Sequence, residues 1–405
     1  NDVKEKWYQN VRRICNDYTK NALEEIGIPE EEFDKYFLKL ENSKVENMDF
    51  SVEDKLFVEN FIKKTKGVKS ERTRKILEIQ REWTEQLKKC DEVELYIIKS
   101  TVIIAGTCTG FVSNRIIRDV EFDYVIVDEA AKATFPELAV SLNKIILVGD
   151  HQQLPPVLDT EIIRNNKEKL DEEGLAQGIF ERMYNMFPED NKHRLTIQYR
   201  MHPTIGTLIS HVFYNDEIQN GVEAQDRELC IEGYEGIAIE WISTSKYSTK
   251  ERYEKEFDNN GKKSYQNYLE RNIIERKLLE LDSKLVKRTK IAVITGYGSQ
   301  KYILQTMVKQ HSFKHIEVDV DTVDAFQGSQ KDIILYSTVR SSGNKYGIGF
   351  LKSEARINVA FSRARCLLII VGDMKFLDNY KIRGNKFPEI IKYITESEGC
   401  RIIEK

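Results

Sequence analysis

The chain has 405 residues, enough for two or three domains, and its 40% apolar and 32% charged residues are typical of a soluble globular protein. It contains no run of about 18 apolar residues and no signal peptide, and its six cysteines form no C-x-x-C pair, so we expect a cytoplasmic protein without a membrane span. The net charge of −4 excludes a globally basic protein, and any binding of nucleic acid must therefore use a local groove.

The first hundred residues are predicted to form a helical stalk. Apolar side chains recur at helical spacing between Trp7 and Tyr18, and again between Ile76 and Leu87. Glycine and proline are scarce there, and both signs of charge are mixed along each segment. We interpret residues 1–100 as a helical hairpin with a narrow apolar seam, whose charges form a solvated face rather than a binding surface.

Six short runs of apolar, β-branched residues follow residue 100 and predict strands buried on both faces of a parallel sheet. Ligands of open α/β sheets bind at the carboxyl ends of the strands, so we expect the chemistry at these six ends. Three runs precede residue 195 and three follow residue 290, which predicts two α/β lobes. The runs are 102–105, 124–127, 144–148, 291–295, 333–337 and 367–371.

Two strand ends about twenty residues apart carry candidate chemistry. The second run ends in the acidic pair Asp128-Glu129, of which the first carboxylate can hold Mg²⁺ and the second can deprotonate a water molecule. Such a pair more often serves only as a helix cap. The third run ends in the rigid loop 149–156, from which Gln153 can sense a γ-phosphate. The two ends together are more specific than either one alone.

Five ordered strings resemble the motifs of superfamily 1 helicases. Gln-Tyr-Arg-Met-His-Pro and Asp-Ala-Phe-Gln-Gly are similar to the branch that includes the nonsense-mediated decay helicase and senataxin. The resemblance implies two RecA-like P-loop NTPase lobes over 101–194 and 195–405, the first incomplete, with the stalk 1–100 inserted into it. ATP and Mg²⁺ would be used at the lobe interface to move along single-stranded DNA or RNA. The strings are 128–131, 149–154, 198–203, 323–328 and 356–365.

The resemblance also implies a role for each residue of the first-lobe ATP site. Asp128 would coordinate Mg²⁺, and Glu129 would be the catalytic base. Gln153 would contact both the γ-phosphate and the attacking water.

The second lobe would complete the ATP site. By resemblance, Tyr199 stacks near the adenine, Arg200 reaches the γ-phosphate and Arg363 is the arginine finger. Gly328 and Gln330 would lie against the nucleotide. Relatives commonly have Glu where this chain has Gln330, whose amide can still bond a ribose hydroxyl, although without charge assistance. Ordinary packing for Tyr199 and a surface ion pair for Arg363 are the alternatives.

Hydroxyl-bearing and polar residues at other strand ends are predicted to contact nucleic acid. They suit phosphates and sugars rather than base edges, so we expect little sequence preference. Turn residues that merely cap strands are an equal alternative for each position. The predicted contacts are Thr107, Thr109, Thr295, Tyr297, Gln300 and Thr322.

A phosphate-binding loop of the form G-x-x-x-x-G-K-[ST] is absent from the sequence. The nearest string, 259–264, lacks the upstream glycine and is predicted to be a polar surface loop. In the family this loop precedes the acidic pair by well over a hundred residues. The chain also begins at Asn1 without Met, so we expect a piece of a longer protein that is inactive alone.

Two other classes of function remain open. The chain could be a non-catalytic nucleic-acid-binding or scaffold module, or an ATPase switch that does not move on nucleic acid. The joint presence of Asp128, Glu129, Arg200 and Arg363 favours a motor, because a binding module needs none of them. Nucleic-acid stimulation of the ATPase separates a motor from a switch. The choice between DNA and RNA stays open, and no protein partner is predicted.

Overall fold

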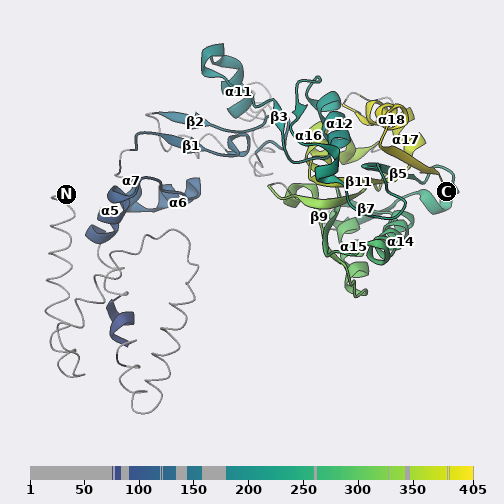
Figure 1. The fold of residues 1–405 in the computed structure, drawn as a ribbon, viewed down its shortest axis with the longest axis horizontal. Coiled ribbons are helices and arrows are strands. Elements are labelled where there is room, and N and C mark those ends of the chain that lie inside the picture. The colour runs from purple at the N-terminus through teal and green to yellow at the C-terminus, as the bar shows by residue number, and fades with distance from the viewer. Residues whose placement is uncertain are drawn as a thin grey trace. The chain divides into compact units, whose positions relative to one another are not determined.

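The computed structural model divides the chain into two compact units, residues 1–120 and 121–405, and each is described by itself (Figure 1). The predicted stalk lies largely outside the described residues and stays a prediction, as do the domain limits at residues 100 and 194. Among the described residues, no helix is both long and apolar enough to cross a membrane. The structure describes residues 75, 78–83, 91–118, 120, 122–133, 144–156, 179–259, 262–326, 328–342, 347–380, 382 and 384–404.

Among its described residues, the first unit is helical at 75 and 78–83 and in α5 (Asp91–Ser100), α6 (Cys108–Ser113) and α7 (Arg115–Arg118). The strand predicted over 102–105 is wrong, because these residues lie between α5 and α6 without strand pairing. Val102 is 97% exposed and Ile103 is 80% exposed. A strand forms only when a neighbour supplies its ladder of hydrogen bonds, and β-branched residues alone do not provide one.

The second unit contains a sheet of six parallel strands, called the large sheet, in the order β12-β5-β11-β10-β8-β9. The predicted α/β class with a parallel sheet is confirmed. The strands predicted at 291–295, 333–337 and 367–371 are β8, β10 and β11, and β5, β9 and β12 are additional. The bounds are β5 (Ile239–Ser243), β8 (Thr289–Thr295), β9 (Ile316–Thr322), β10 (Lys331–Ser337), β11 (Ala364–Gly372) and β12 (Cys400–Glu404).

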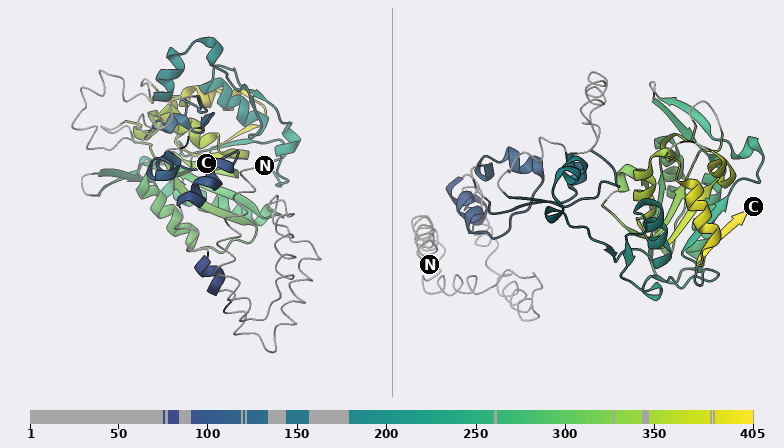
Figure 2. Two further views of the ribbon diagram at one scale, coloured as in Figure 1. Left: turned by 90° about the vertical axis from the view of Figure 1, so that its left-hand side faces the viewer. Right: turned by 90° about the horizontal axis from the view of Figure 1, so that it is seen from above.

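The large sheet buries both of its faces because successive side chains of a strand point to opposite sides. Ile334 and Leu368 join one apolar cluster, whereas their neighbours Ile333 and Leu367 join another. In Figures 1 and 2, helices cover both faces of this sheet. The first cluster includes residues of α12 (Pro203–Phe213), α16 (Glu354–Phe361) and α18 (Phe387–Glu396), and the second includes residues of α14 (Tyr268–Lys284) and α15 (Gly298–Lys309).

A second parallel pair, called the small sheet, joins β1 (Val125–Val127) to β2 (Ile145–Leu147). Both strands were predicted, and both are confirmed. Val127 and Leu147 pack against a cluster of Ala130, Ala131 and Phe180. Other elements of the described residues are α11 (Ile179–Met186), the hairpin of β6 (Lys255–Asn259) and β7 (Lys262–Gln266), α13 (Thr249–Arg252), α17 (Met374–Asn379), and the pair β3 (Ile197–Gln198) and β4 (Gln219–Asn220).

Candidate functional site

The acidic pair directly follows β1, and both side chains are exposed. Asp128 accepts a hydrogen bond through Oδ1 from the backbone N–H of Glu129 at 2.9 Å. Glu129 precedes the 3-10 helix η1 (Ala130–Lys132) in a left-handed conformation, φ 53° and ψ 36°, and its side chain makes no capping hydrogen bond. This conformation costs a residue other than glycine about 1–2 kcal/mol. The helix-cap alternative is therefore disfavoured, and the Glu129 carboxylate is available for chemistry.

The turn after β2 brings Gly149 against the backbone of η1. A Cβ at Gly149 would lie 2.9 Å from the backbone nitrogen of Ala131 and 3.2 Å from that of Ala130, so this approach requires glycine. The N–H of Ala130 also donates to the carbonyl of Val148 at 2.8 Å. The two strand ends that carry the acidic pair and the glutamine loop are thus held side by side.

Asp150 organises the loop after β2. Its Oδ1 accepts from the N–H of Gln152 at 3.0 Å, and its Oδ2 accepts from Nε2 of Gln153 at 2.9 Å. The other amide atom, Oε1 of Gln153, is buried and has no hydrogen-bond partner among the described residues. Buried acceptors without a partner are rare in proteins, so this oxygen indicates a place for a donor such as a bound water.

The string Gln198 to Pro203 forms the entrance to α12. Oε1 of Gln198 accepts from the N–H groups of Arg200 (2.9 Å) and Met201 (2.7 Å), while its Nε2 donates to the Met201 carbonyl at 3.0 Å. His202 then caps α12 through Nδ1, and Pro203 occupies its first turn, where a missing N–H costs nothing. Gln198, His202 and Pro203 thus have local structural reasons, and together they fix the backbone from which Arg200 projects.

Two guanidinium groups share the partner Ser362 within the electrostatic reach of Glu129. Arg363 is 2% exposed and donates to the carbonyls of Val359 (3.1 Å) and Ser329 (3.2 Å). Arg200 donates to the carbonyl of Ser362 at 3.3 Å. Burial, and next the charge of Arg200, lower the pKa of Arg363 to about 10, while the carboxylate of Glu129 acts in the opposite direction.

Burial likewise lowers the pKa of Arg200 below its ordinary value, and the charge of Glu129 partly opposes this shift. All hydrogen bonds found for the two guanidinium groups go to carbonyl and hydroxyl oxygens. Among the described residues no carboxylate pairs with either cation, so a bound anion would stabilise them.

Arg363 does not lie at the carboxyl end of a strand, where the general rule for α/β sheets predicted the chemistry. Arg363 directly precedes β11, and its carbonyl accepts from the N–H of Lys331, the first residue of β10. It therefore lies at the amino ends of these strands. The expectation that all chemistry sits at carboxyl ends holds for the positions of Asp128 and Gln153 but is wrong for Arg363, because its position follows the end of α16.

Tyr214, which sequence reasoning missed, joins the loop after β2 to α16. It stands at the end of α12, and its hydroxyl donates to Oδ2 of Asp150 at 2.5 Å. Nδ2 of Asn358, on α16, donates to the Tyr214 hydroxyl at 2.8 Å and to the carbonyl of Gln152 at 3.1 Å. Burial, and next the charge of Asp150, raise the pKa of Tyr214, so its hydroxyl stays protonated. No local pattern in the sequence marks this tyrosine.

Comparison with known proteins fits these motifs. Two family models, each described as an AAA domain, match residues 3–161 and 175–375. A regulator of nonsense transcripts 1 homolog of Drosophila melanogaster is 35% identical over 301 residues, which are 72% of this chain and 24% of that protein. The ATP-dependent helicase NAM7 of Saccharomyces cerevisiae is 33% identical over 324 residues, 78% of this chain and 31% of that protein. This chain belongs to the superfamily 1 helicases of the nonsense-mediated-decay branch.

The helicase chain is shorter than these relatives and spans less than one third of the length of either. An uncharacterized ATP-dependent helicase of Methanocaldococcus jannaschii is 29% identical over 84% of this chain and 48% of that protein. Among solved structures, the PRRSV helicase shares 17% identity over 61% of this chain and 34% of that chain, with a TM-score of 0.30. A likeness this weak carries no argument, and the family assignment rests on the sequences.

Three second-lobe residues that were predicted to contact nucleic acid in this helicase are buried. Thr295 and Gln300 are 0% exposed, and Tyr297 is 3% exposed. Gln300 accepts from the N–H of Asn267 at 2.7 Å and donates to the hydroxyl of Ser337 at 3.1 Å. Side chains without surface cannot touch a ligand in this arrangement, so contact here would use backbone groups or follow a rearrangement.

The other predicted ligand contacts are accessible to differing degrees. In the first unit, Thr107 and Thr109 are exposed, and Thr107 also caps α6 by accepting from the N–H of Gly110 at 3.0 Å. Thr322, at the end of β9, is half-buried. Three nucleotide-site predictions lie at the surface of the second unit: Tyr199, which is 62% exposed, Gly328 and Gln330.

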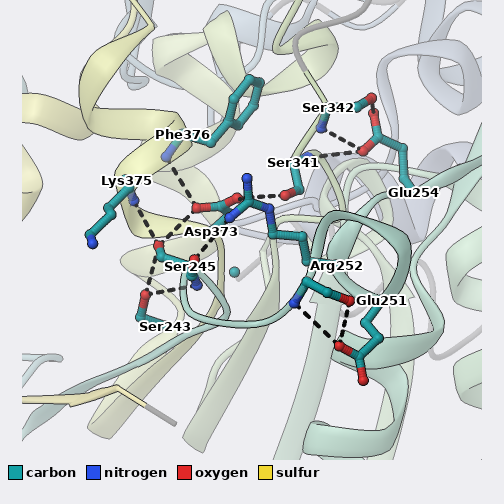
Figure 3. Close-up of polar contacts among 12 residues, drawn as sticks. Ser243, Ser245, Glu251, Arg252, Glu254, Ser341, Ser342, Asp373, Lys375 and Phe376 are labelled. Atoms are coloured by element: carbon teal, nitrogen blue, oxygen red, sulfur yellow. Dashed lines mark hydrogen bonds and ion pairs between the residues drawn. The ribbon is translucent and has the colours of Figure 1, made fainter.

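A buried polar network, shown in Figure 3, ties together the carboxyl ends of three neighbouring strands of the large sheet. Asp373, directly after β11, accepts from the hydroxyls of Ser245 (2.8 Å) and Ser341 (2.6 Å), which follow β5 and β10. Glu254 accepts from the N–H groups of Ser341 and Ser342, both at 2.9 Å. Sequence reasoning did not single out this network. Its internal bonds make this edge of the sheet rigid.

Proposed function

We propose that this helicase chain is part of a motor that hydrolyses Mg-ATP and moves along single-stranded DNA or RNA. One observation carries the proposal: Arg200 and the buried Arg363 both donate to Ser362 within the electrostatic reach of Glu129, and among the described residues neither is paired with a carboxylate. A phosphoryl group in transfer is an anion whose charge such donors stabilise. A scaffold protein would gain nothing from burying two like charges together.

Glu129, Gln153, Arg200 and Arg363 each have a chemical role that their contacts permit. Glu129 accepts the proton of the attacking water, because its carboxylate is not occupied by a cap. Gln153 accepts a hydrogen bond from the other hydrogen of that water through Oε1, which has no partner among the described residues. Arg200 and Arg363 neutralise the transferring phosphoryl group.

Magnesium fits this site as an ion shared between protein and substrate. The described residues contain no group of three or more histidine, cysteine, aspartate or glutamate side chains that could hold a metal. The exposed carboxylate of Asp128 is one oxygen donor of the kind that Mg²⁺ prefers, and Mg²⁺ commonly takes its other ligands from water and substrate phosphates. Bound there, the ion would neutralise charge on the phosphates.

We further propose that this chain alone is not an ATPase. Its sequence has no G-x-x-x-x-G-K-[ST] string to supply the N–H groups and the lysine that neutralise the phosphates. ATP would face Asp128 and Glu129 with too little compensating charge. The purified chain should therefore show no Mg²⁺-dependent hydrolysis above background. Hydrolysis that disappears on Glu129→Gln would contradict this expectation and exclude a contaminant.

The proposed partner is a single strand, bound with little sequence preference and in the cytoplasm. The accessible candidates, such as Thr107 and Thr109, offer hydroxyl and backbone groups rather than arms long enough to read bases. Binding of this kind is dominated by phosphates, so the affinity should fall steeply as salt is added.

The decisive experiment uses a form of the protein with a phosphate-binding loop upstream of this chain. Glu129→Gln should lower kcat of the nucleic-acid-stimulated ATPase by about 10²- to 10⁴-fold, because a general base is lost, while ATP binding stays. Glu232→Gln, which changes an exposed glutamate elsewhere, is the control and should match the wild type. Turnover within about threefold of the wild type for Glu129→Gln would remove the proposed base. An ATPase that single strands do not stimulate would support the switch, and binding without hydrolysis the scaffold.

A further inference from the structure

The hydroxyl of Tyr214 lies at the centre of a chain of hydrogen bonds between two parts of the proposed ATP site. Its contact with Asp150 spans 64 residues of sequence, and its contact with Asn358 spans 144. An ionised aspartate can only accept, so the phenol must give its single proton to Asp150. Its oxygen then accepts from the Asn358 amide. The direction of the whole chain is therefore determined.

Asp150 transmits this contact to Gln153. The carboxylate oxygen that takes the Tyr214 proton, Oδ2, also accepts from Nε2 of Gln153 at 2.9 Å. With the amide nitrogen committed, Oε1 is the atom left for a ligand, and it is buried without a partner among the described residues. The side of the amide that faces a ligand thus depends on where Asp150 is held.

The other end of the chain reaches the segment that carries the proposed arginine finger. Asn358 lies on α16, which ends at Phe361, and Arg363 follows two residues later. Arg363 donates back to the carbonyl of Val359, the neighbour of Asn358, at 3.1 Å. A displacement of α16 therefore moves Asn358 and Arg363 together.

We infer that Tyr214 is a positioning residue, which holds Asp150 so that Gln153 presents its free oxygen to the attacking water only while Asn358 of α16 is docked. The inference rests on the proposed ATPase function. Tyr214 touches neither ATP nor water; it acts through Asp150 and Gln153. One set of contacts then aligns both Gln153 and Arg363. The attacking water is therefore oriented at the same time as the phosphoryl group is stabilised.

Tyr214→Phe is the direct test, because it removes the hydroxyl and keeps the ring. In the form of the enzyme that carries a phosphate-binding loop, kcat of the stimulated ATPase should fall by about 10- to 100-fold, as expected for a displaced reacting group. The KM for ATP should stay within about threefold, because no contact with ATP is lost. Tyr393→Phe is the matched control: Tyr393 is half-buried and donates to the carbonyl of Thr204, in the first turn of the same helix α12, at 3.1 Å.

A double-mutant cycle separates positioning from a general loss of structure. If Tyr214 acts through Gln153, then Tyr214→Phe should add almost nothing to the loss in kcat caused by Gln153→Ala. Additive losses, an unchanged kcat in Tyr214→Phe, or an equal fall in Tyr393→Phe would each overturn the inference. If the wild-type enzyme shows no stimulated ATPase, the proposed function fails first and the inference fails with it. If Glu129→Gln is inactive but Tyr214→Phe is normal, the function stands and only the inference fails.

Discussion

The small sheet and the large sheet are built from similar apolar runs, yet they differ in how completely they are covered. Ile333 and Ile334 of β10 are both 0% exposed, whereas Ile126 of β1 is 66% exposed and Ile146 of β2 is 46% exposed. Similar apolar runs thus form strands buried on both faces in the large sheet, and strands that are only half-buried on one face in the small sheet. The carboxylates of the proposed site follow the less covered strand, and the arginines belong to the region of the large sheet. The proposed site therefore combines residues beside the fully covered large sheet with residues beside the half-exposed small sheet.

The largest expected effect comes from removing Arg363, which the large-sheet region contributes to the proposed catalysis. Arg363→Ala, in the enzyme with a phosphate-binding loop, should lower kcat by about 10³-fold or more, because the transferring phosphoryl group loses a buried cation. The stimulated ATPase is the measurement. Arg365→Ala is the control, since the half-exposed ion pair of Arg365 with Asp332 contributes little. A kcat within about threefold of the wild type would show that Arg363 has only a structural role.

A comparison of two isoleucines tests the difference in coverage directly. Ile334→Ala should lower the free energy of unfolding by about 2–5 kcal/mol, because the fully packed cluster around it cannot fill the cavity. Ile126→Ala should change it by less than about 0.5 kcal/mol, since its side chain is largely in solvent. Urea unfolding of the chain measures both. Equal costs would show that the exposed face of the small sheet is covered in solution, for instance by a second copy.

A smaller effect comes from a buried carboxyl beneath the end of β10. Glu270 on α14 accepts from the hydroxyl of Ser337 (2.6 Å) and the N–H of Val339 (2.9 Å). Burial raises the pKa of Glu270 to about 8, above its ordinary value of 4.5. The folded state therefore keeps a proton that the unfolded state loses between these values. The free energy of unfolding should fall as pH rises through this window, by up to about 1.4 kcal/mol per pH unit.

Glu270→Gln should flatten this dependence, because an amide does not titrate. Urea unfolding from about pH 5 to about pH 8 is the measurement, and Glu232→Gln should keep the slope of the wild type. An unchanged slope in Glu270→Gln would mean that other groups carry the pH dependence. Glu270 is buried against the end of β10, so this measurement reports on the core of the large sheet.

Much of the site was predictable because its residues stand in short strings with local structural reasons. The acidic pair directly follows the apolar strand β1, and Gln198 holds the backbone of Arg200 within its own turn. What could not be predicted depends on partners far along the chain. Tyr214 has no motif around it and gains meaning only from Asp150 and Asn358. Gln300 looked like a ligand contact, but Asn267 and Ser337 bury it.

The sequence by itself determined the α/β class, the strands at 291–295, 333–337 and 367–371, and the family, because continuous apolar runs and motif strings are local patterns. Tertiary structure decided which runs become strands and which charges meet. The run 102–105 has the right residues but no strand partner, while β9, whose acidic residues alternate with apolar ones, pairs with β8. The physical reason is that a strand, a buried hydroxyl or a buried cation is stabilised only by groups that complete its hydrogen bonds or its charge. The fold alone brings those groups together.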